Sequence, residues 1–224
     1  MSFIVAIDGP AGTGKGTITE IISKKLNLVN IGTGSAYRCV ALAAIENNIN
    51  IDDTEKIVDL LDKIKIEFKK INDKDLIFLN GKDVTKRLRE KDVSTTVSKV
   101  SLIKDVRFKL TDIFKKQAET RDVIMEGRDI GTCVFPNADV KIFLDASLDE
   151  RIRRRVKQNE ELGINMSLKE IEDNMRQRDY DDKTREVGAL KQADDAIYID
   201  SSNLSIDEVV NEVIDIIKKK KEIK

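Results

Sequence analysis

A glycine-rich segment near the start of the chain carries the residues best suited to chemistry. It reads Asp-Gly-Pro-Ala-Gly-Thr-Gly-Lys-Gly-Thr over residues 8–17 and follows the apolar, β-branched run of residues 3–7. Glycines at this spacing let a loop turn its backbone N–H groups inward toward a polyphosphate. Lys15 would reach the outer phosphates, and the helix that starts near Gly14 adds its positive end to the same anion. The segment therefore predicts a nucleoside triphosphate site.

One position departs from the usual Gly-x-x-x-x-Gly-Lys-[Ser/Thr] pattern. Gly16 stands where a magnesium-binding hydroxyl is common, and the hydroxyl comes one residue later, at Thr17. The candidate for contact with Mg²⁺ is therefore Thr17, or water held by an acid such as Asp8. The alternative interpretation is a glycine-rich turn between a strand and a helix. The register of Lys15 in the pattern favours the phosphate site.

Two further clusters could contribute to a second phosphate site. Residues 32–38 follow the second predicted strand, and there Thr33 offers a hydroxyl and a backbone N–H, while Arg38 comes about one helical turn later. Residues 178–185 read Arg-Asp-Tyr-Asp-Asp-Lys-Thr-Arg at the end of a predicted helix. Taken singly, the first cluster also fits an ordinary helix cap, and the second also fits a charged surface.

A third cluster follows another predicted strand and reads Glu-Gly-Arg-Asp-Ile-Gly over residues 126–131. Ligands of open parallel sheets bind beyond the carboxyl ends of the strands, which is where Arg128 and Asp129 would lie. A salt-bridged turn would explain the same residues without a ligand. The phosphate loop upstream favours the ligand site.

Residues 150–185 carry a high density of arginine. Two solvated helices would account for it, but above a phosphate site we favour a mobile, arginine-bearing lid, from which Arg154, Arg155 and Arg185 would approach the phosphates on closure. The arginines of this stretch are Arg151, Arg153, Arg154, Arg155, Arg176, Arg178 and Arg185.

The composition narrows the chemistry further, because the 224 residues include no histidine. This excludes Ser-His-Asp and Cys-His catalysis and histidine-bound zinc, whereas phosphoryl transfer needs mainly positioning and positive charge. The net charge is −1, and no apolar run reaches membrane-spanning length, so we expect neither nucleic acid nor membrane as a partner. Cys39 and Cys133 suggest no disulfide framework. We expect a cytoplasmic monomer that acts on small molecules.

Short apolar runs alternate with amphipathic segments, which predicts an α/β fold with a parallel sheet covered by helices on both faces. A small antiparallel insert is predicted at residues 64–79, where two apolar segments flank a polar turn and Asn80-Gly81 follows. Three Ser-x-x-Glu sequences predict capping boxes, beginning at Ser147, Ser167 and Ser205. The predicted strands are residues 3–7, 28–30, 123–125, 140–144 and 196–199. The predicted helices are residues 15–26, 36–47, 103–119, 148–162, 168–180 and 206–219.

Together these motifs resemble those of the bacterial cytidylate kinases, which transfer a phosphoryl group from ATP to CMP or dCMP. The similarity spans essentially the whole chain and rests on residues 8–17, 33–38, 127–132, 135–136, 140–147 and 178–185. It implies a P-loop kinase core with a five-stranded parallel sheet, a small antiparallel insert in the part that binds the nucleoside monophosphate, and a helical lid. One domain, residues 1–224, would then consist of a core (1–35, 120–150 and 190–224), a monophosphate-binding part (about 36–119) and a lid (about 150–186).

The resemblance also implies roles for individual residues. Mg²⁺ would accompany ATP, which would bind at Gly9, Pro10, Ala11, Gly12, Thr13, Gly14, Lys15, Gly16 and Thr17. The CMP phosphate would bind to Arg38, Arg128 and Arg185, with Thr33 at the start of that site. The cytosine ring would be recognised by Ser98, Arg107 and Asp129, and the ribose by Asp182. Catalysis would depend on Lys15, Arg128 and Arg185, joined by Arg154 and Arg155 from the lid.

Some positions differ from the family pattern. Gly32 stands where many relatives have aspartate, Lys183 replaces a serine, and Gly188-Ala189-Leu190 replaces Ala-Pro-Leu, which leaves details of the helix entrance and the lid hinge open. Two alternatives also remain: a P-loop kinase for AMP, UMP or another small acceptor, and a non-catalytic nucleotide switch. A second arginine cluster argues against a switch, which needs one nucleotide site only.

Overall fold

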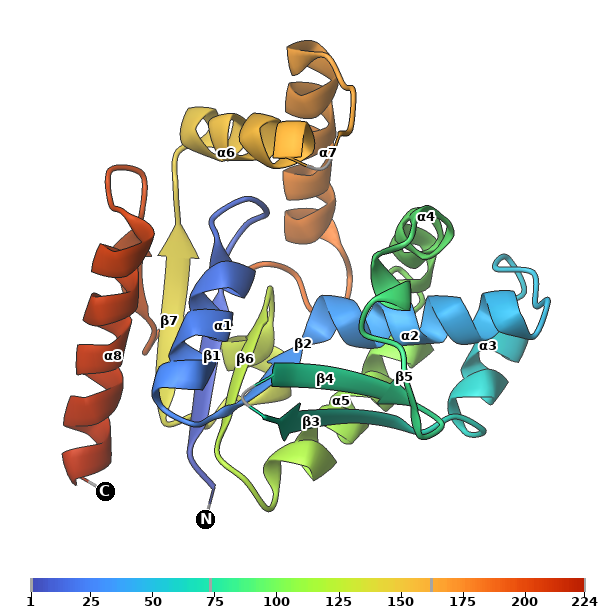
Figure 1. The fold of residues 1–224 in the computed structure, drawn as a ribbon, viewed down its shortest axis with the longest axis horizontal. Coiled ribbons are helices and arrows are strands. Elements are labelled where there is room, and N and C mark those ends of the chain that lie inside the picture. The colour runs from blue at the N-terminus through green and yellow to red at the C-terminus, as the bar shows by residue number, and fades with distance from the viewer. Residues whose placement is uncertain (1, 73, 162, 224) are drawn as a thin grey trace.

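The computed structural model describes residues 2–72, 74–161 and 163–223. Its centre is the predicted five-stranded parallel sheet, and the structure gives its strand order as β2-β6-β1-β7-β8 (Figure 1). The strands are β1 (Ile4–Asp8), β2 (Val29–Gly32), β6 (Val123–Gly127), β7 (Val140–Asp145) and β8 (Ile197–Asp200). The carboxyl ends of all five therefore meet at one edge of the sheet, where ligands of such folds bind.

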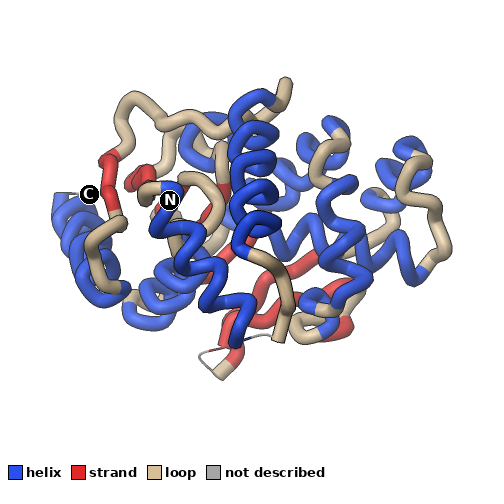
Figure 2. The backbone as a smooth tube through the Cα atoms, turned by 90° about the horizontal axis from the view of Figure 1, so that it is seen from above, coloured by secondary structure: helices blue, strands red, loops and turns tan. Residues whose placement is uncertain are grey.

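Both faces of the sheet are covered by helices, which Figure 2 shows from above. On one face, α1 (Lys15–Lys25) and α8 (Ile206–Ile223) pack on β1 and β7. On the other face lie α2 (Thr33–Glu46) and α5 (Lys104–Ala118). Within β1, Val5 and Ile7 point into the core under α1 and α8, and Ala6 points into the core under α2 and α5; all three are fully buried. A strand buried on both faces has to be apolar throughout, which is why residues 3–7 show no alternation.

The predicted antiparallel insert is present between α2 and α5. Strands β3 (Ile66–Ile71) and β4 (Lys74–Leu79) pair antiparallel, and β5 (Lys82–Asp83) adds to the edge of β4 after the turn at Asn80-Gly81. Asp73, part of the predicted polar turn, lies outside the described residues. The structure adds two helices that the pattern did not predict, α3 (Thr54–Leu61) and α4 (Lys91–Val100), and a short 3-10 turn, η1 (Arg87–Arg89).

The insert is fastened to the core by polar side chains. Lys70 Nζ on β3 donates to the carbonyl oxygens of Ser23, in the last turn of α1, and of Leu28, just before β2. Ser23 Oγ in turn donates to Asp75 Oδ2 on β4 at 3.0 Å. These bonds hold the insert against the helix that follows the phosphate loop.

The predicted helical hairpin stands above the carboxyl edge of the sheet (Figure 1). It consists of α6 (Leu148–Glu161) and α7 (Leu168–Thr184); Leu162, where we predicted the end of the first helix, lies outside the described residues. Helix α7 continues four residues beyond the predicted end at Tyr180, and this places Asp182 on the helix. No described helix is both long enough and apolar enough to cross a bilayer.

Two of the three predicted capping boxes are complete. At Ser167 and Ser205, the serine hydroxyl accepts from the glutamate N–H and the glutamate carboxylate accepts from the serine N–H. At Ser147 the prediction is wrong in part. Its hydroxyl accepts from the Glu150 N–H, but its own N–H donates to Ser202 Oγ. The Glu150 carboxylate is instead engaged by arginines one turn further along the helix.

Candidate functional site

The loop between β1 and α1 has the backbone that the glycines predict. Gly12 and Gly14 lie in the left-handed region, with φ of 84° and 90°. Gly9 has φ 151°, and a Cβ at this position would overlap the carbonyl oxygen of Leu144 on β7. Side chains are strained in such conformations, so the loop can keep this close path along the sheet edge only with glycine at these places.

Lys15, the first residue of α1, is buried inside this loop. Its Nζ donates to the carbonyl of Pro10 at 2.6 Å and to Thr13 Oγ1 at 3.2 Å. Burial, and next the positive charge of Arg128, lower the pKa of Lys15 to about 7. A cation held among other cations is unfavourable on its own and is stabilised by an anion, which is what a phosphate site provides.

Asp8, at the end of β1, links the loop to the neighbouring strand. Its two carboxylate oxygens accept from the backbone N–H groups of Ile130 at 2.8 Å and Gly131 at 2.7 Å. Those residues begin a single π-helical turn, η2 (Ile130–Val134), directly after β6. Burial raises the pKa of Asp8 to about 6, although both hydrogen bonds act in the opposite direction. The carboxylate thus fixes the position of the Arg128–Asp129 turn relative to the phosphate loop.

Two of the three predicted phosphate-binding arginines, Arg128 and Arg185, meet at Asp182. Arg128 Nε donates to Asp182 Oδ2 at 2.6 Å, and Arg185 Nη2 pairs with Asp182 Oδ1. Arg38 on α2 is half-buried, and burial lowers its pKa. Thr33 begins α2, three residues before the predicted start, and its hydroxyl donates to the Glu126 carbonyl at 3.0 Å. Segments 33–38, 126–131 and 178–185 therefore meet, as the sequence analysis expected.

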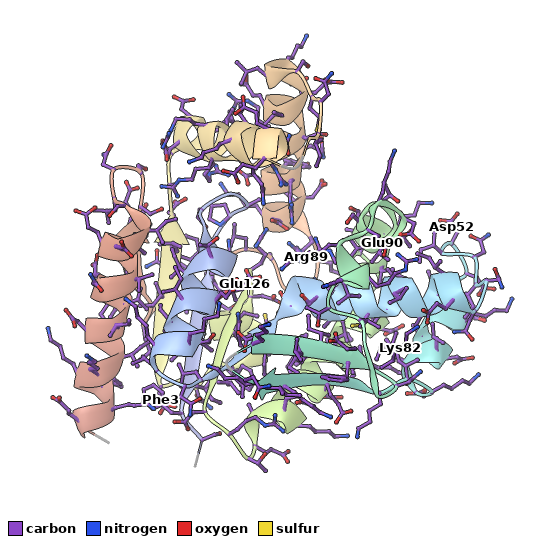
Figure 3. The ribbon with its side chains drawn as sticks, viewed as in Figure 1. Phe3, Asp52, Lys82, Arg89, Glu90 and Glu126 are labelled. Atoms are coloured by element: carbon purple, nitrogen blue, oxygen red, sulfur yellow. The ribbon has the colours of Figure 1, made fainter. Side chains whose placement is uncertain are left out.

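Positive charge exceeds negative charge around this cluster. Arg89 lies on η1, and its charge contributes to lowering the pKa of Arg38, whereas the charge of Glu126 at the end of β6 opposes the shift. Figure 3 shows Arg89 on the segment that enters α4 and Glu126 on β6. Arg178 on α7 keeps part of its side chain exposed to solvent. Partial loss of solvation, followed by the charge of Arg128, lowers its pKa. Such an excess of cations favours a ligand of high negative charge.

Beside this cluster lies a buried ion pair between α5 and the turn after β6. Arg107 Nη2 contacts Asp129 Oδ2 at 2.8 Å, and the two side chains are only 8% and 13% exposed. The guanidinium also stacks on Tyr37, 5.7 Å from the ring centre, while its Nε has no hydrogen-bond partner among the described residues. Gly188, at φ 67°, lies so close that a Cβ would overlap the Asp129 carboxylate.

A small pocket opens next to this pair, and one wall of it comes from the segment that follows α7. Its lining includes Arg107 from one side and Arg185 from the other; the remaining residues are Ser101, Leu102, Lys104, Glu186 and Val187. Ser98, the third residue predicted to recognise a base, has an exposed side chain on α4, and its carbonyl accepts from Ser101 Oγ of the pocket lining at 2.8 Å. A contact of Ser98 with a ligand stays a prediction.

The two lid arginines of the sequence prediction have different surroundings. Arg154 Nη1 donates to the Thr13 carbonyl at 3.1 Å, and Nη2 donates to the Ser201 carbonyl at 2.6 Å. Its guanidinium therefore supports the outer side of the phosphate loop. Arg155 is half-buried and donates to Gln158 on its own helix. Direct contact of either side chain with a phosphate stays a prediction.

Sequence reasoning counted Arg151 and Arg178 among the lid arginines without giving either an individual role, and it did not single out Asp179. One signal was available for Arg178, because Arg178 and Asp182 are four residues apart and face the same side of a helix. Arg151 and Asp179 form a buried pair between α6 and α7, with 2.7 Å between Nη2 and Oδ2. They are 28 residues apart, and no local pattern in the sequence joins them.

Comparison with known proteins is consistent with this geometry. The family profile described as Cytidylate kinase matches residues 5–219. A cytidylate kinase of Lactobacillus gasseri is 46% identical over 216 residues, which cover 96% of this chain and 94% of that protein. A cytidylate kinase of Fusobacterium nucleatum is 45% identical over 210 residues, or 94% of each chain. A crystal structure of an uncharacterized protein from Eubacterium ventriosum shares the fold, with a TM-score of 0.56 at 13% identity over 97% of this chain and 99% of that one.

Proposed function

Because this chain belongs to the cytidylate kinase family, we propose that it transfers the γ-phosphoryl group of ATP to CMP or dCMP, which yields ADP and CDP or dCDP. The observation that carries the proposal is that two anion-binding clusters follow neighbouring strands. The loop around Lys15 follows β1 and Arg128 follows β6, and the two strand ends are paired at Asp8 and Gly127. The Asp8 carboxylate also binds the N–H groups of Ile130 and Gly131, just after Arg128. Two adjoining anion sites suit a donor and an acceptor phosphate.

The reaction needs two phosphates held in line while negative charge is stabilised during transfer. We propose that Arg38, Arg128 and Arg185 hold the acceptor phosphate, and that Lys15 follows the charge on the group in transfer. The attacking oxygen belongs to a phosphate that is already an anion, so no strong general base is required. This is compatible with a chain that has no histidine.

We propose that the acceptor base binds at the Arg107–Asp129 pair. Cytosine presents an amino donor next to two acceptors, the ring nitrogen and the carbonyl. The Asp129 carboxylate would accept from the amino group, and Arg107, whose Nε is buried without a partner in the described part of the chain, would donate to the acceptors. Uracil replaces the amino group with a carbonyl, whose lone pairs would face those of Asp129. The pair therefore favours CMP over UMP.

Mg²⁺ is part of the proposal as a companion of ATP. Among the described residues, no three acidic, cysteine or histidine side chains gather into a metal site. Thr17, whose side chain is exposed in the first turn of α1, and Asp8 are the residues that fit a role beside the ion. A bound Mg²⁺ would neutralise charge on the donor phosphates, and nucleotide and water oxygens would supply most of its coordination.

The direct test is kcat/KM for CMP, dCMP, UMP and AMP at saturating Mg·ATP, measured by coupled detection of ADP. We expect CMP to be used far better than UMP, and AMP hardly at all. Equal use of UMP or AMP would leave only a general nucleoside monophosphate kinase. Release of ADP at the same rate with and without a nucleoside monophosphate would indicate hydrolysis of ATP and would contradict transfer to a nucleotide.

A further inference from the structure

The outward-facing carbonyl groups of the phosphate loop are bound by the first lid helix. A loop that turns its N–H groups toward an anion must turn carbonyl groups away from it, and buried carbonyls need donors. Arg151 Nη1 donates to the Ala11 carbonyl at 3.1 Å, and Arg154 Nη1 donates to the Thr13 carbonyl at 3.1 Å. Helix α6 therefore supports the loop from behind.

Arg151 also reaches beyond the loop. Its Nε donates to the Ala146 carbonyl, just after β7, at 3.0 Å, and its guanidinium forms a two-point contact with the Asp179 carboxylate on α7 at 3.1 and 2.7 Å. The Arg151 side chain is 7% exposed and that of Asp179 is 16% exposed. One buried guanidinium thus joins the sheet edge, the phosphate loop and the second lid helix.

Packing brings the same elements together. A Cβ on Gly12 would lie 3.0 Å from Met175 Cε on α7 and 3.2 Å from Arg151 Cβ, so both lid helices lie directly against the loop. One turn beyond Asp179, helix α7 carries Asp182, which holds Arg128 and Arg185. A shift of the loop therefore has a short, rigid route to the acceptor side through Arg151 and α7.

We propose that Arg151 and Asp179 form a positioning pair that couples nucleotide binding at the phosphate loop to the placement of the acceptor-site residues on α7. The pair acts through its neighbours and touches neither phosphate. A planar, bidentate guanidinium suits this role, because it holds the direction as well as the distance between its partners. This inference rests on the proposed function, in which the loop binds the donor and the α7 side contributes to the acceptor site.

The test is hydrogen exchange on the full-length protein, with and without the β,γ-imido analogue of ATP and Mg²⁺, in the absence of CMP. In the wild type we expect the analogue to slow exchange of α7 amides roughly fivefold or more, because ordering of the loop is passed to the helix. In Asp179→Ala we expect the analogue to bind and to protect the loop, but to leave α7 exchange nearly unchanged. Asp181→Asn, an exposed acid on the same helix, is the matched control and should behave as wild type.

Steady-state kinetics supply a second measurement, because a pair that only stabilised the fold would leave kcat of the folded enzyme unchanged. Asp179→Ala should lower kcat roughly tenfold while the KM for CMP changes little. Asp179→Glu, which keeps a carboxylate, should restore part of kcat, whereas Arg151→Lys should not, because one ammonium cannot serve three separated acceptors. If Asp179→Ala unfolds, the isosteric Asp179→Asn takes its place in both assays.

The outcomes separate the two proposals. If the wild type does not bind the ATP analogue, the proposed function fails and the coupling fails with it. If the analogue binds and α7 is protected equally in the wild type and in Asp179→Ala, only the coupling is overturned. The same conclusion follows if the variant lowers thermal stability but leaves kcat unchanged.

Discussion

Replacement of Asp129 by asparagine probes base recognition most sharply, because it changes one charge at nearly constant shape. Asp129 contacts Arg107 at 2.8 Å in surroundings that leave the two side chains 8% and 13% exposed. Asparagine still offers Arg107 a carbonyl oxygen, but it now presents an N–H₂ group where cytosine also presents one. Uracil, with a carbonyl at that position, would instead gain a donor.

The size of the effect follows from the burial of the pair. A hydrogen bond to a charged group contributes about 1.5–3 kcal/mol, so kcat/KM for CMP should fall roughly 10- to 100-fold in Asp129→Asn. Asp129→Ala removes the acceptor altogether and should reduce CMP use at least as much, by roughly 100-fold or more. It also leaves the buried Arg107 charge unpaired, which should lower the free energy of unfolding by about 3–5 kcal/mol. Use of UMP should rise or stay level in Asp129→Asn, so that the CMP/UMP ratio collapses.

The assay is kcat/KM for CMP and UMP at saturating Mg·ATP in the wild type, both Asp129 variants and Asp105→Asn. Asp105 is an exposed acid in the first turn of α5, the helix that carries Arg107, so its replacement controls for a general change of charge. Circular dichroism and thermal unfolding establish that the variants are folded. A CMP/UMP ratio in Asp129→Asn equal to that of the wild type would refute the assignment of base recognition to this pair.

Four further predictions concern residues 8–17, the phosphate loop and its flanks. Lys15→Ala should lower kcat roughly 100-fold or more with little loss of stability, and near-normal turnover would contradict its role. Burial lowers the pKa of Lys15 to about 7, and the negative charge of bound ATP should raise it again, so ATP binding at pH 8 should take up protons. Calorimetry should show this uptake as a binding heat that varies with the ionisation heat of the buffer, and Lys15→Met should abolish that variation. Burial raises the pKa of Asp8 to about 6, so the native state binds more protons than the unfolded state between about pH 4 and 6. The contribution of Asp8 to the free energy of unfolding therefore falls as the pH rises through that window. Asp8→Asn should remove this part of the pH dependence, as measured by denaturant titrations at several pH values. Gly9→Ala should reduce the free energy of unfolding by about 2 kcal/mol or more, because its Cβ meets the Leu144 carbonyl, and an unchanged urea midpoint would disprove that.

The sequence by itself determined the features whose causes are local. The phosphate loop depends on glycines and a lysine within ten residues, and the fully apolar run before it defines a strand buried on both faces. The turn at Asn80-Gly81 and the two apolar segments before it specified the antiparallel insert. The convergence of residues 33–38 and 126–131 also followed from sequence, because each follows a parallel strand and the carboxyl ends of such strands share one edge. Residues 178–185 end helix α7, and the fold brings them to the same edge.

Tertiary structure alone decided the partners of groups that can pair in several ways. A contact of Arg154 with phosphate stays a prediction, but its bond to the Thr13 carbonyl, 141 residues away, could not be predicted from sequence. Ser147 lost half of its expected capping box because Ser202, 55 residues away, supplies the acceptor for its N–H. The contact of Arg151 with Ala11 spans 140 residues. An arginine side chain carries five N–H donors, and the local sequence does not specify their acceptors. Its partners are therefore the backbone carbonyls that the folded sheet and loop place within hydrogen-bond distance.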